Sequence, residues 1–388
     1  MRVLSKQVFA RYDGRPVCTG FVTYISSTEP ALMHCAGRED YSDAYDDYGY
    51  SISRDNGQTW SDPVLLLKGY DVEEGRIRFG EPCAFFDADT NKVLVLYDKS
   101  LYPRDTFDTD RAIEILLDIY DPATDKWAGG VPLNLSPGSP MAVSFCFPIK
   151  TSGRRVLVPA IRRVLGEDGK PLHYKGCWAP VNESIVIIGQ YRSDGSLAWQ
   201  LSQPVNISPE VSSRGVSENT LAELRDGRIA MVCRGDNSMF PENPGYKWLP
   251  FSEDGGFTWS KPVPFPCTEG EPIESSATGS AFFRSIKNDR LYWMGNLCIH
   301  GCRPKGNYPR TPLIIAEVQE EPFGLIRDSI TVIDEQAPGE PDAVQMSNFR
   351  FYQDRDNGDL VVFLSRYAER SAEKWMDADY YRYRVRID

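Results

Sequence analysis

The chain repeats one pattern of apolar and polar positions: a strand-like run, a short polar turn, and a second, more continuously apolar run. The clearest copies cover residues 83–98, 144–161, 220–235, 280–295 and 349–364, and a degenerate copy covers residues 20–37. The turns contain DTN, TSG, DG, KND or DNG, which are typical of β-hairpins. Successive copies begin about 60 to 75 residues apart, so the pattern predicts six similar units.

A unit of this length suits a four-stranded antiparallel sheet, and six such sheets suit a six-bladed β-propeller. The two ends of the chain, MRVLSKQVF and YYRYRVRID, both alternate as strands do. We therefore expect an all-β fold in which the N- and C-terminal strands share a blade and close the ring, with residues 1–388 forming a single domain. A two-sheet sandwich and a parallel β-helix are the alternatives, but the first usually has fewer strands and the second shorter repeats.

Composition narrows the class of protein. The apolar fraction of 41% and the charged fraction of 25% are those of a soluble globular protein. The net charge of −12 argues against nucleic acid or a membrane surface as partner. Nine cysteines without a CxxC pair and only three histidines offer few zinc ligands. We expect a cytoplasmic protein with reduced thiols and no metal or other cofactor; the sequence does not indicate its oligomeric state.

One octapeptide is written twice, as SRDNGQTW at residues 53–60 and as SEDGGFTW at residues 252–259. Its Asp can accept hydrogen bonds from the backbone ahead of it, its Gly supplies a positive φ, and its Trp covers the turn. Each copy follows the second strand-like run of its unit. We expect both at the turn from the third to the fourth strand of a blade, where Asp55 and Asp254 are structural.

These octapeptides resemble the Asp-box, or BNR repeat, of the sialidase superfamily, whose members are six-bladed propellers. The resemblance implies the fold more than the activity, because the box occurs in sialidases, in other glycosidases and in propellers that only bind. A propeller usually binds its ligand over the central channel. Polar residues at the ends of the innermost strands are therefore the candidates for a site.

The fourth unit, SENTLAELRDGRIAMVCRGD, holds the most informative pair. The resemblance places Glu218 on the family's glutamate, and it places Arg234, with Arg310 in NYPRTPLIIAEV, on arginines that bind a substrate carboxylate. From the residues alone, Glu218 and Arg234 flank one hairpin and can reach one face, with a structural ion pair as the alternative. Glu81 is a rival to Glu218. Arg78, close to Glu81 in sequence, could join the other arginines in binding a uronic acid.

An acidic segment precedes the first octapeptide and contains Asp40, Asp43, Asp46 and Asp47. The resemblance implies a general acid in this loop, nearest to Asp43, with Asp46 as a second candidate. A carboxyl group partly closed off from water has a raised pKa suited to protonating a leaving oxygen. Arg38 would contact substrate or neutralise these carboxylates, and a solvated acidic loop is the alternative.

The chain also departs from the family's pattern. Thr28-Glu29-Pro30 stands where the first arginine motif is expected. No tyrosine stands near Asn348 or Phe349, where the nucleophile is expected, unless Tyr352 or Tyr367 takes its place. Both departures argue against a true sialidase.

We therefore expect an exo-type glycoside hydrolase with a Glu/Asp pair, acting on an oligosaccharide that carries an acidic or otherwise charged sugar. The first alternative is a polysaccharide lyase acting on a uronate with a His or Tyr base, for which His34 and His300 are candidates. The second is a binding propeller in which aromatic side chains such as Tyr246, Trp178 and Trp248 stack on sugar rings. A true sialidase is the last alternative.

Overall fold

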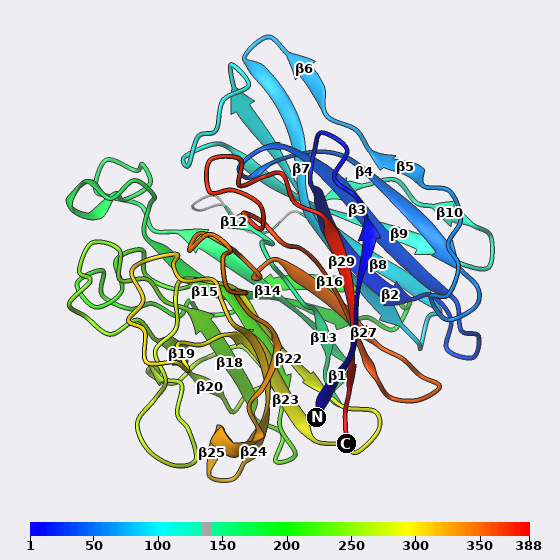
Figure 1. The fold of residues 1–388 in the computed structure, drawn as a ribbon. Coiled ribbons are helices and arrows are strands. Elements are labelled where there is room, and N and C mark those ends of the chain that lie inside the picture. The colour runs from blue at the N-terminus through cyan, green and yellow to red at the C-terminus, as the bar shows by residue number, and fades with distance from the viewer. Residues whose placement is uncertain (134, 136–140) are drawn as a thin grey trace.

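Six separate antiparallel sheets make up the fold in the computed structural model, which describes residues 1–133, 135 and 141–388 (Figure 1). Each sheet is one blade of a six-bladed β-propeller, so the predicted all-β architecture is confirmed. The described residues include two short 3-10 helices, Tyr174–Gly176 and Arg327–Ser329. No helix in that part of the chain is long and apolar enough to cross a membrane.

Blades 1 to 3 follow one another along the first half of the chain. Blade 1 consists of β2 (Val17–Tyr24), β3 (Leu32–Tyr41), β4 (Ala44–Ser53) and β5 (Val64–Leu67). Blade 2 consists of β7 (Gly75–Asp87), β8 (Lys92–Pro103), β9 (Ile113–Asp121), β10 (Lys126–Trp127) and β11 (Val131–Pro132), with β6 (Tyr70–Val72) paired to the start of β7. Blade 3 consists of β12 (Met141–Ala142), β13 (Ile149–Lys150), β14 (Arg155–Arg163), β15 (Asn182–Tyr191) and β16 (Leu197–Leu201).

Blades 4 to 6 complete the ring. Blade 4 consists of β17 (Ser217–Glu223), β18 (Ile229–Arg234), β19 (Lys247–Leu249), β20 (Phe251–Ser252) and β21 (Val263–Pro264). Blade 5 consists of β22 (Ser280–Arg284), β23 (Leu291–Asn296), β24 (Leu313–Glu320), β25 (Phe323–Leu325) and β26 (Thr331–Asp334). Blade 6 consists of β27 (Phe349–Gln353), β28 (Leu360–Ser365), β29 (Tyr380–Arg386) and β1 (Arg2–Ala10).

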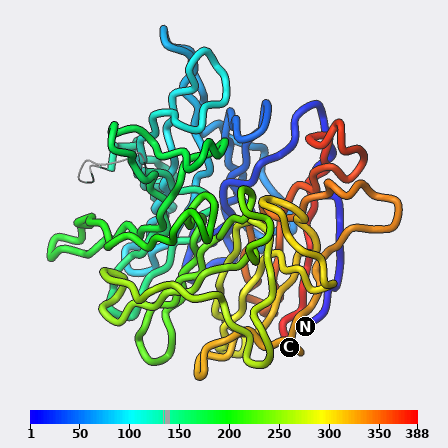
Figure 2. Tube along the Cα trace, turned by 90° about the vertical axis from the view of Figure 1, so that its left-hand side faces the viewer, coloured from blue at the N-terminus to red at the C-terminus, as the bar shows by residue number. Residues whose placement is uncertain are grey.

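The two chain ends meet in blade 6, as predicted. Strand β1 pairs antiparallel with β29 along its whole length. The amino group of Met1 lies 2.6 Å from a carboxylate oxygen of Asp388. Both views show the two termini side by side (Figures 1 and 2). The ring is thus closed by hydrogen bonds between the first and last strands.

The apolar core is divided among the contacts between neighbouring blades. One cluster joins blades 4 and 5 around the fully buried Trp293, and another joins blades 6 and 1 around Phe363. Similar clusters lie between the other neighbouring pairs. Because the blades bury their apolar faces against each other, the ends of the innermost strands are free to carry polar side chains.

The two octapeptide turns have the same hydrogen bonds. Asp55 accepts from the backbone N–H groups of Gln58 (3.1 Å) and Thr59 (2.8 Å) and from the Thr59 hydroxyl (2.5 Å). Asp254 does the same with Phe257 and Thr258. The hydrogen bonds from Thr59 lower the pKa of Asp55 to about 2. The turns lie between β4 and β5 and between β20 and β21, so these carboxylates hold turns between the outer strands.

Candidate active site

Two glutamates stand at β-bulges on the innermost strands of blades 2 and 4. In β7 the register shifts between residues 80 and 83, and Glu81 has a φ of 34°. In β17 it shifts between residues 217 and 220, and Glu218 has a φ of 39°. Bulges re-aim side chains, and strained backbone at non-glycine residues clusters at functional sites. The same local device therefore presents both glutamates.

Glu81 is held by three donors from the two neighbouring blades. The Tyr45 hydroxyl of blade 1 donates to Oε1 at 3.0 Å. On Oε2, the Ser144 hydroxyl donates at 3.2 Å and the backbone N–H of Phe145 donates a short hydrogen bond. Phe145 itself has a left-handed backbone, with a φ of 46°. The carboxyl group is thus fixed in one orientation between blades 1, 2 and 3.

Neighbouring charges act on Glu81. Burial raises its pKa, and the guanidinium of Arg350, 3.8 Å away, opposes that shift. The carboxylates of Glu218 and Asp43 raise the pKa further. Because charges influence each other only over short distances, these three acidic groups share one site. Burial and these two negative charges therefore favour the protonated form of Glu81.

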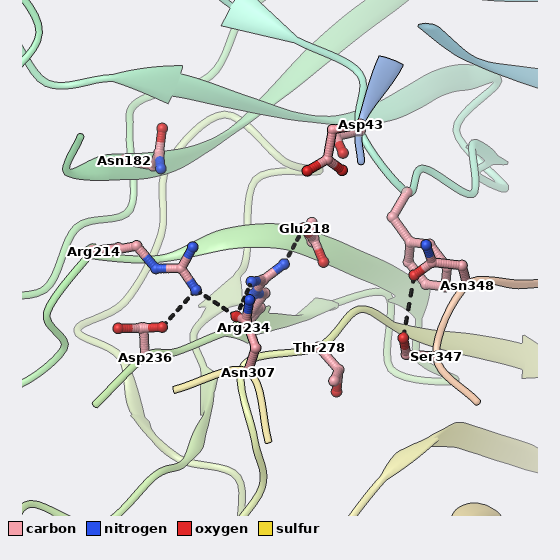
Figure 3. A network of polar contacts seen from close by, with 12 residues as sticks. Asp43, Asn182, Arg214, Glu218, Arg234, Asp236, Thr278, Asn307, Ser347 and Asn348 are labelled. Carbon is pink, nitrogen blue, oxygen red and sulfur yellow. Dashed lines mark hydrogen bonds and ion pairs between the residues drawn. The ribbon is translucent and has the colours of Figure 1, made fainter. Parts of the chain in front are cut away.

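Glu218 forms an ion pair with Arg234, which is the alternative that the sequence left open beside a shared functional face (Figure 3). Arg234 also donates to the Asn307 side chain at 3.0 Å, and Asn307 accepts a second bond from Arg214 at 2.8 Å. Arg214 in turn pairs with Asp236. Asp43 lies on the opposite side of Glu218 from this network (Figure 3). The Glu218 carboxyl group therefore has an arginine on one side and Asp43 on the other.

Arg310 belongs to the same site but has no carboxylate partner within 4 Å among the described residues. It donates to the Asn307 carbonyl (3.2 Å), the Gln345 side chain (3.1 Å) and the Ser347 hydroxyl (3.2 Å). Burial lowers the pKa of Arg310, and the charge of Arg234 lowers it further. A partly buried cation without a carboxylate within 4 Å is suited to receive an anion from a ligand.

Lys247 adds a third cation, fully buried where Arg234 and Arg310 are partly buried, and the sequence analysis missed it. Its ammonium group donates to the carbonyl and hydroxyl of Thr278, and its side chain is 1% exposed. Burial, reinforced by Arg234, lowers the pKa of Lys247 to about 7. A lysine flanked by Tyr246 and Trp248 in a strand is the signal that could have marked it.

The acidic segment is a hairpin and not the loop that we expected. Strand β3 continues to Tyr41 and β4 begins at Ala44, so Asp43 sits at the tip, exposed and with a φ of 58°. Asp46 lies on β4, buried in an ion pair with Arg76 at 2.7 Å, and accepts from the Gly69 N–H. These contacts fit a structural ion pair, and the catalytic role of Asp46 stays a prediction without further support.

Glu39, on the preceding strand, was also missed by the sequence analysis. The Tyr367 hydroxyl donates to it at 2.7 Å, and the backbone N–H of Asp43 donates at 2.8 Å. Tyr367 is thus engaged with a buried carboxyl group. Tyr352, the other tyrosine considered as a nucleophile, has its hydroxyl against the Asn56 carbonyl between blades 6 and 1.

Arg350 stands close to the position where the family's tyrosine was expected. Its Nε donates to the Gly20 carbonyl at 2.6 Å, and its guanidinium lies 4.7 Å over the Phe145 ring. An arginine inside the aromatic strand FRFYQ was the available signal. The segment 28–30, where the first arginine motif was expected, lies in the turn after β2. The arginine nearest to the start of β2 is Arg15, and it forms an ion pair with Asp40 at 2.8 Å.

Several further candidates lie away from the glutamates or are already paired. Arg38 bonds Asp13 at 2.9 Å on the loop before β2. His34 is packed between blades 6 and 1, where Nε2 meets the Tyr380 hydroxyl at 2.8 Å and burial lowers its pKa to about 4. These two line a separate pocket between blades 6 and 1, away from the glutamates, and their role in substrate binding stays a prediction.

The remaining candidates are placed as follows. His300 is exposed and pairs with Glu335 at 3.2 Å. Tyr246 packs edge-on against Trp248, outside the polar network. Arg78 lines a pocket beside Glu81, but its guanidinium is buried in ion pairs with Asp40 and Asp105. It is not free to bind a uronic acid.

No protein-family model matches the sequence, and no curated relative matches it. Solved structures do match. Hadza microbial sialidase Hz136 is 12% identical with a TM-score of 0.65, and the match covers 95% of this chain but 66% of that one, just under two thirds. The intramolecular trans-sialidase from Ruminococcus gnavus is 12% identical with a TM-score of 0.64, over 100% of this chain and 98% of that one.

A third match is α-L-arabinanase from Penicillium chrysogenum complexed with arabinobiose. It is 11% identical with a TM-score of 0.59, over 100% of this chain and 98% of that one. Matches at such low identity show similarity of fold alone, and the six sheets with their closed ring agree with that fold. The chain has the sialidase-like six-bladed propeller fold.

Proposed function

We propose that this chain is an exo-type glycoside hydrolase that acts on an oligosaccharide with an acidic terminal sugar. The observation that carries the proposal is the pair of bulge glutamates, one with a raised pKa and one held beside an arginine. Two carboxyl groups in different protonation states are what glycoside hydrolysis requires. The sialidase, trans-sialidase and arabinanase of similar fold support glycosidase activity in general.

The roles follow from the environments. Glu81, whose pKa is raised, would protonate the leaving oxygen as general acid. Glu218, held beside Arg234, would attack the anomeric carbon or activate a water molecule. Asp43, exposed at the hairpin tip, is the second candidate for the acid.

The basic side of the site suggests the class of sugar. Arg310 has no acidic partner in the described part of the chain, and Arg234 lies beside it. A carboxylate on the terminal sugar would neutralise Arg310 through charge-assisted hydrogen bonds. That contact would anchor the sugar with its anomeric carbon near the glutamates, which is why we propose cleavage from the chain end.

The alternatives have less support. For a true sialidase, the tyrosine nucleophile would have to be Tyr45, whose hydroxyl is bonded to Glu81. Tyr45 is only 8% exposed, and burial raises its pKa well above the usual range. It suits positioning of Glu81 better than attack. A lyase with His34 or His300 as base has less support, since the first is bonded to Tyr380 in the core between blades 6 and 1 and the second is exposed beside Glu335.

The test is a screen of the full chain against oligosaccharides that end in uronic or sialic acids. New reducing ends and the ultraviolet absorbance of an unsaturated product are followed together. We expect reducing ends without unsaturation. Glu81→Gln and Glu218→Gln should each lower kcat about 10²- to 10⁴-fold, because each removes a proton-transfer group or nucleophile. The exposed Glu167→Gln is the matched control and should be unaffected.

Two results would contradict the proposal. An unsaturated product would indicate a lyase. Absence of turnover, together with unchanged ligand affinity in Glu218→Gln, would leave a propeller that binds sugars elsewhere or not at all.

A further inference from the structure

A pocket between blades 2 and 3 opens beside Glu81. Residues that line it include Tyr45, Glu81, Asp98, Arg111, Arg163 and Trp178. The first two belong to the proposed active site, so the pocket is continuous with it. The other four have no role in the proposed mechanism.

Two arginines in this pocket lack an acidic partner. Arg163, at the end of β14, is 8% exposed and donates to the backbone carbonyl of Arg111 at 2.8 Å. In the described ranges no carboxylate oxygen lies within 4 Å of either guanidinium, and residues 134 and 136–140 contain no Asp or Glu. The Nε of Arg111 is buried without a hydrogen-bond partner. Arg78, by contrast, has its own carboxylates.

The charge on Arg163 persists at neutral pH. Burial lowers its pKa, and Arg111 lowers it further, to about 10. The carboxylates of Asp110, Asp108 and Asp98 oppose that shift, but none of them lies within 4 Å of the guanidinium. A buried positive charge without a counter-ion is costly, and an anion from a ligand would remove that cost.

Trp178 supplies an apolar surface at the same pocket. Its side chain is 56% exposed, and the guanidinium of Arg214 lies 5.0 Å from its ring centre. Exposed aromatic rings of this kind can stack on sugar rings. A sugar placed against Trp178 could direct a charged substituent toward Arg111 and Arg163.

We propose that this pocket binds an anionic group, a carboxylate or a sulfate ester, on the sugar next to the one that is cleaved. The position of that sugar rests on the proposed function, since it follows from cleavage at Glu81 and Glu218. The binding of an anion by the two arginines does not depend on catalysis. The substrate would then carry negative charge on two consecutive sugars.

Calorimetric titration with digalacturonate, which has two carboxylates, and with the methyl glycoside of galacturonate, which has one, tests the inference. The second carboxylate should make the dimer bind roughly 10- to 100-fold more tightly, as expected for hydrogen bonds to a charged group. Arg111→Gln and Arg163→Gln should lose this advantage. Arg192→Gln, which removes an exposed charge from the same blade, should keep it.

Two free anions distinguish the possible substituents. Inorganic sulfate and acetate are each added as competitors of digalacturonate. Stronger competition by sulfate assigns a sulfate ester to the pocket, and stronger competition by acetate assigns a carboxylate. Either effect should disappear in Arg163→Gln. Competition by neither anion would overturn the inference.

Folding and catalysis are controlled separately. Arg163→Lys keeps the charge and should keep part of the affinity, and melting temperatures identify any variant that fails to fold. If Arg163→Gln does not fold, the half-buried Arg111→Gln carries the test. Glu218→Gln should abolish hydrolysis without removing the advantage of the dimer, so failure of the proposed function is recognisable on its own. The inference would be overturned if Arg111→Gln and Arg163→Gln both lost no more of the dimer's affinity advantage than Arg192→Gln does.

Discussion

Glu39 is a buried carboxyl group that joins blades 1 and 6 through the Tyr367 hydroxyl. Burial raises its pKa to about 7, and the charge of Asp43 adds to the shift. The native state therefore holds this proton more strongly than the unfolded chain, where the ordinary value is 4.5. The contribution to stability is complete below pH 4.5 and is lost as the pH rises through 7.

Glu39→Gln tests this linkage, because the amide keeps the shape of the protonated acid and cannot ionise. At pH 4 the variant and the parent should have similar free energies of unfolding. At pH 8 the variant should be more stable, by on the order of 2 kcal/mol. Urea denaturation at both pH values measures the difference, with the exposed Glu167→Gln as control. A difference of the same size at both pH values would contradict the assignment.

At the scale of one element, the turn between β20 and β21 depends on Asp254. Asp254→Ala removes its two backbone hydrogen bonds and the one from Thr258, so we expect a loss of about 1 kcal/mol of stability. Activity per folded molecule should not change, because the turn joins outer strands. Urea denaturation and a turnover assay separate the two effects, and Asp254→Asn should fall between. Lost activity at unchanged stability would contradict a structural role.

Hairpins of this kind explain how much of the fold could be predicted. The hairpins at 83–98, 220–235, 280–295 and 349–364 fall on β7–β8, β17–β18, β22–β23 and β27–β28, because each turn is encoded locally. The pairing of Glu218 with Arg234 was predictable for the same reason. The structural ion pair of Asp46 was not predictable in this way, because its partner Arg76 belongs to the next blade.

The rest of the site is assembled by contacts between blades. Lys247 reaches Thr278 in the next blade, and Arg350 reaches Gly20 across 330 positions of sequence. No local pattern of apolar and polar residues encodes such a contact. The sequence therefore predicts which strand ends meet at the channel better than it predicts which side chains pair there.

At the scale of the whole molecule, stability depends on closure of the ring by β1. This strand pairs along the length of β29, so deletion of residues 1–10 would expose the backbone edge of β29 and open blade 6. We expect a clearly lower melting temperature and association of the truncated chains. Scanning calorimetry and size-exclusion chromatography measure both.

A circular permutant distinguishes the loss of β1 pairing from the effect of where the chain ends lie. Because the Met1 amino group lies 2.6 Å from the Asp388 carboxylate, a short flexible linker can join the two ends. New ends can be opened in the exposed turn at residues 167–170 of blade 3. The permutant keeps every β1–β29 hydrogen bond, so its melting temperature should stay close to that of the parent while the truncated chain melts far below it. A truncated chain as stable as the parent would show that the remaining five blades and β27–β29 hold the ring without this strand.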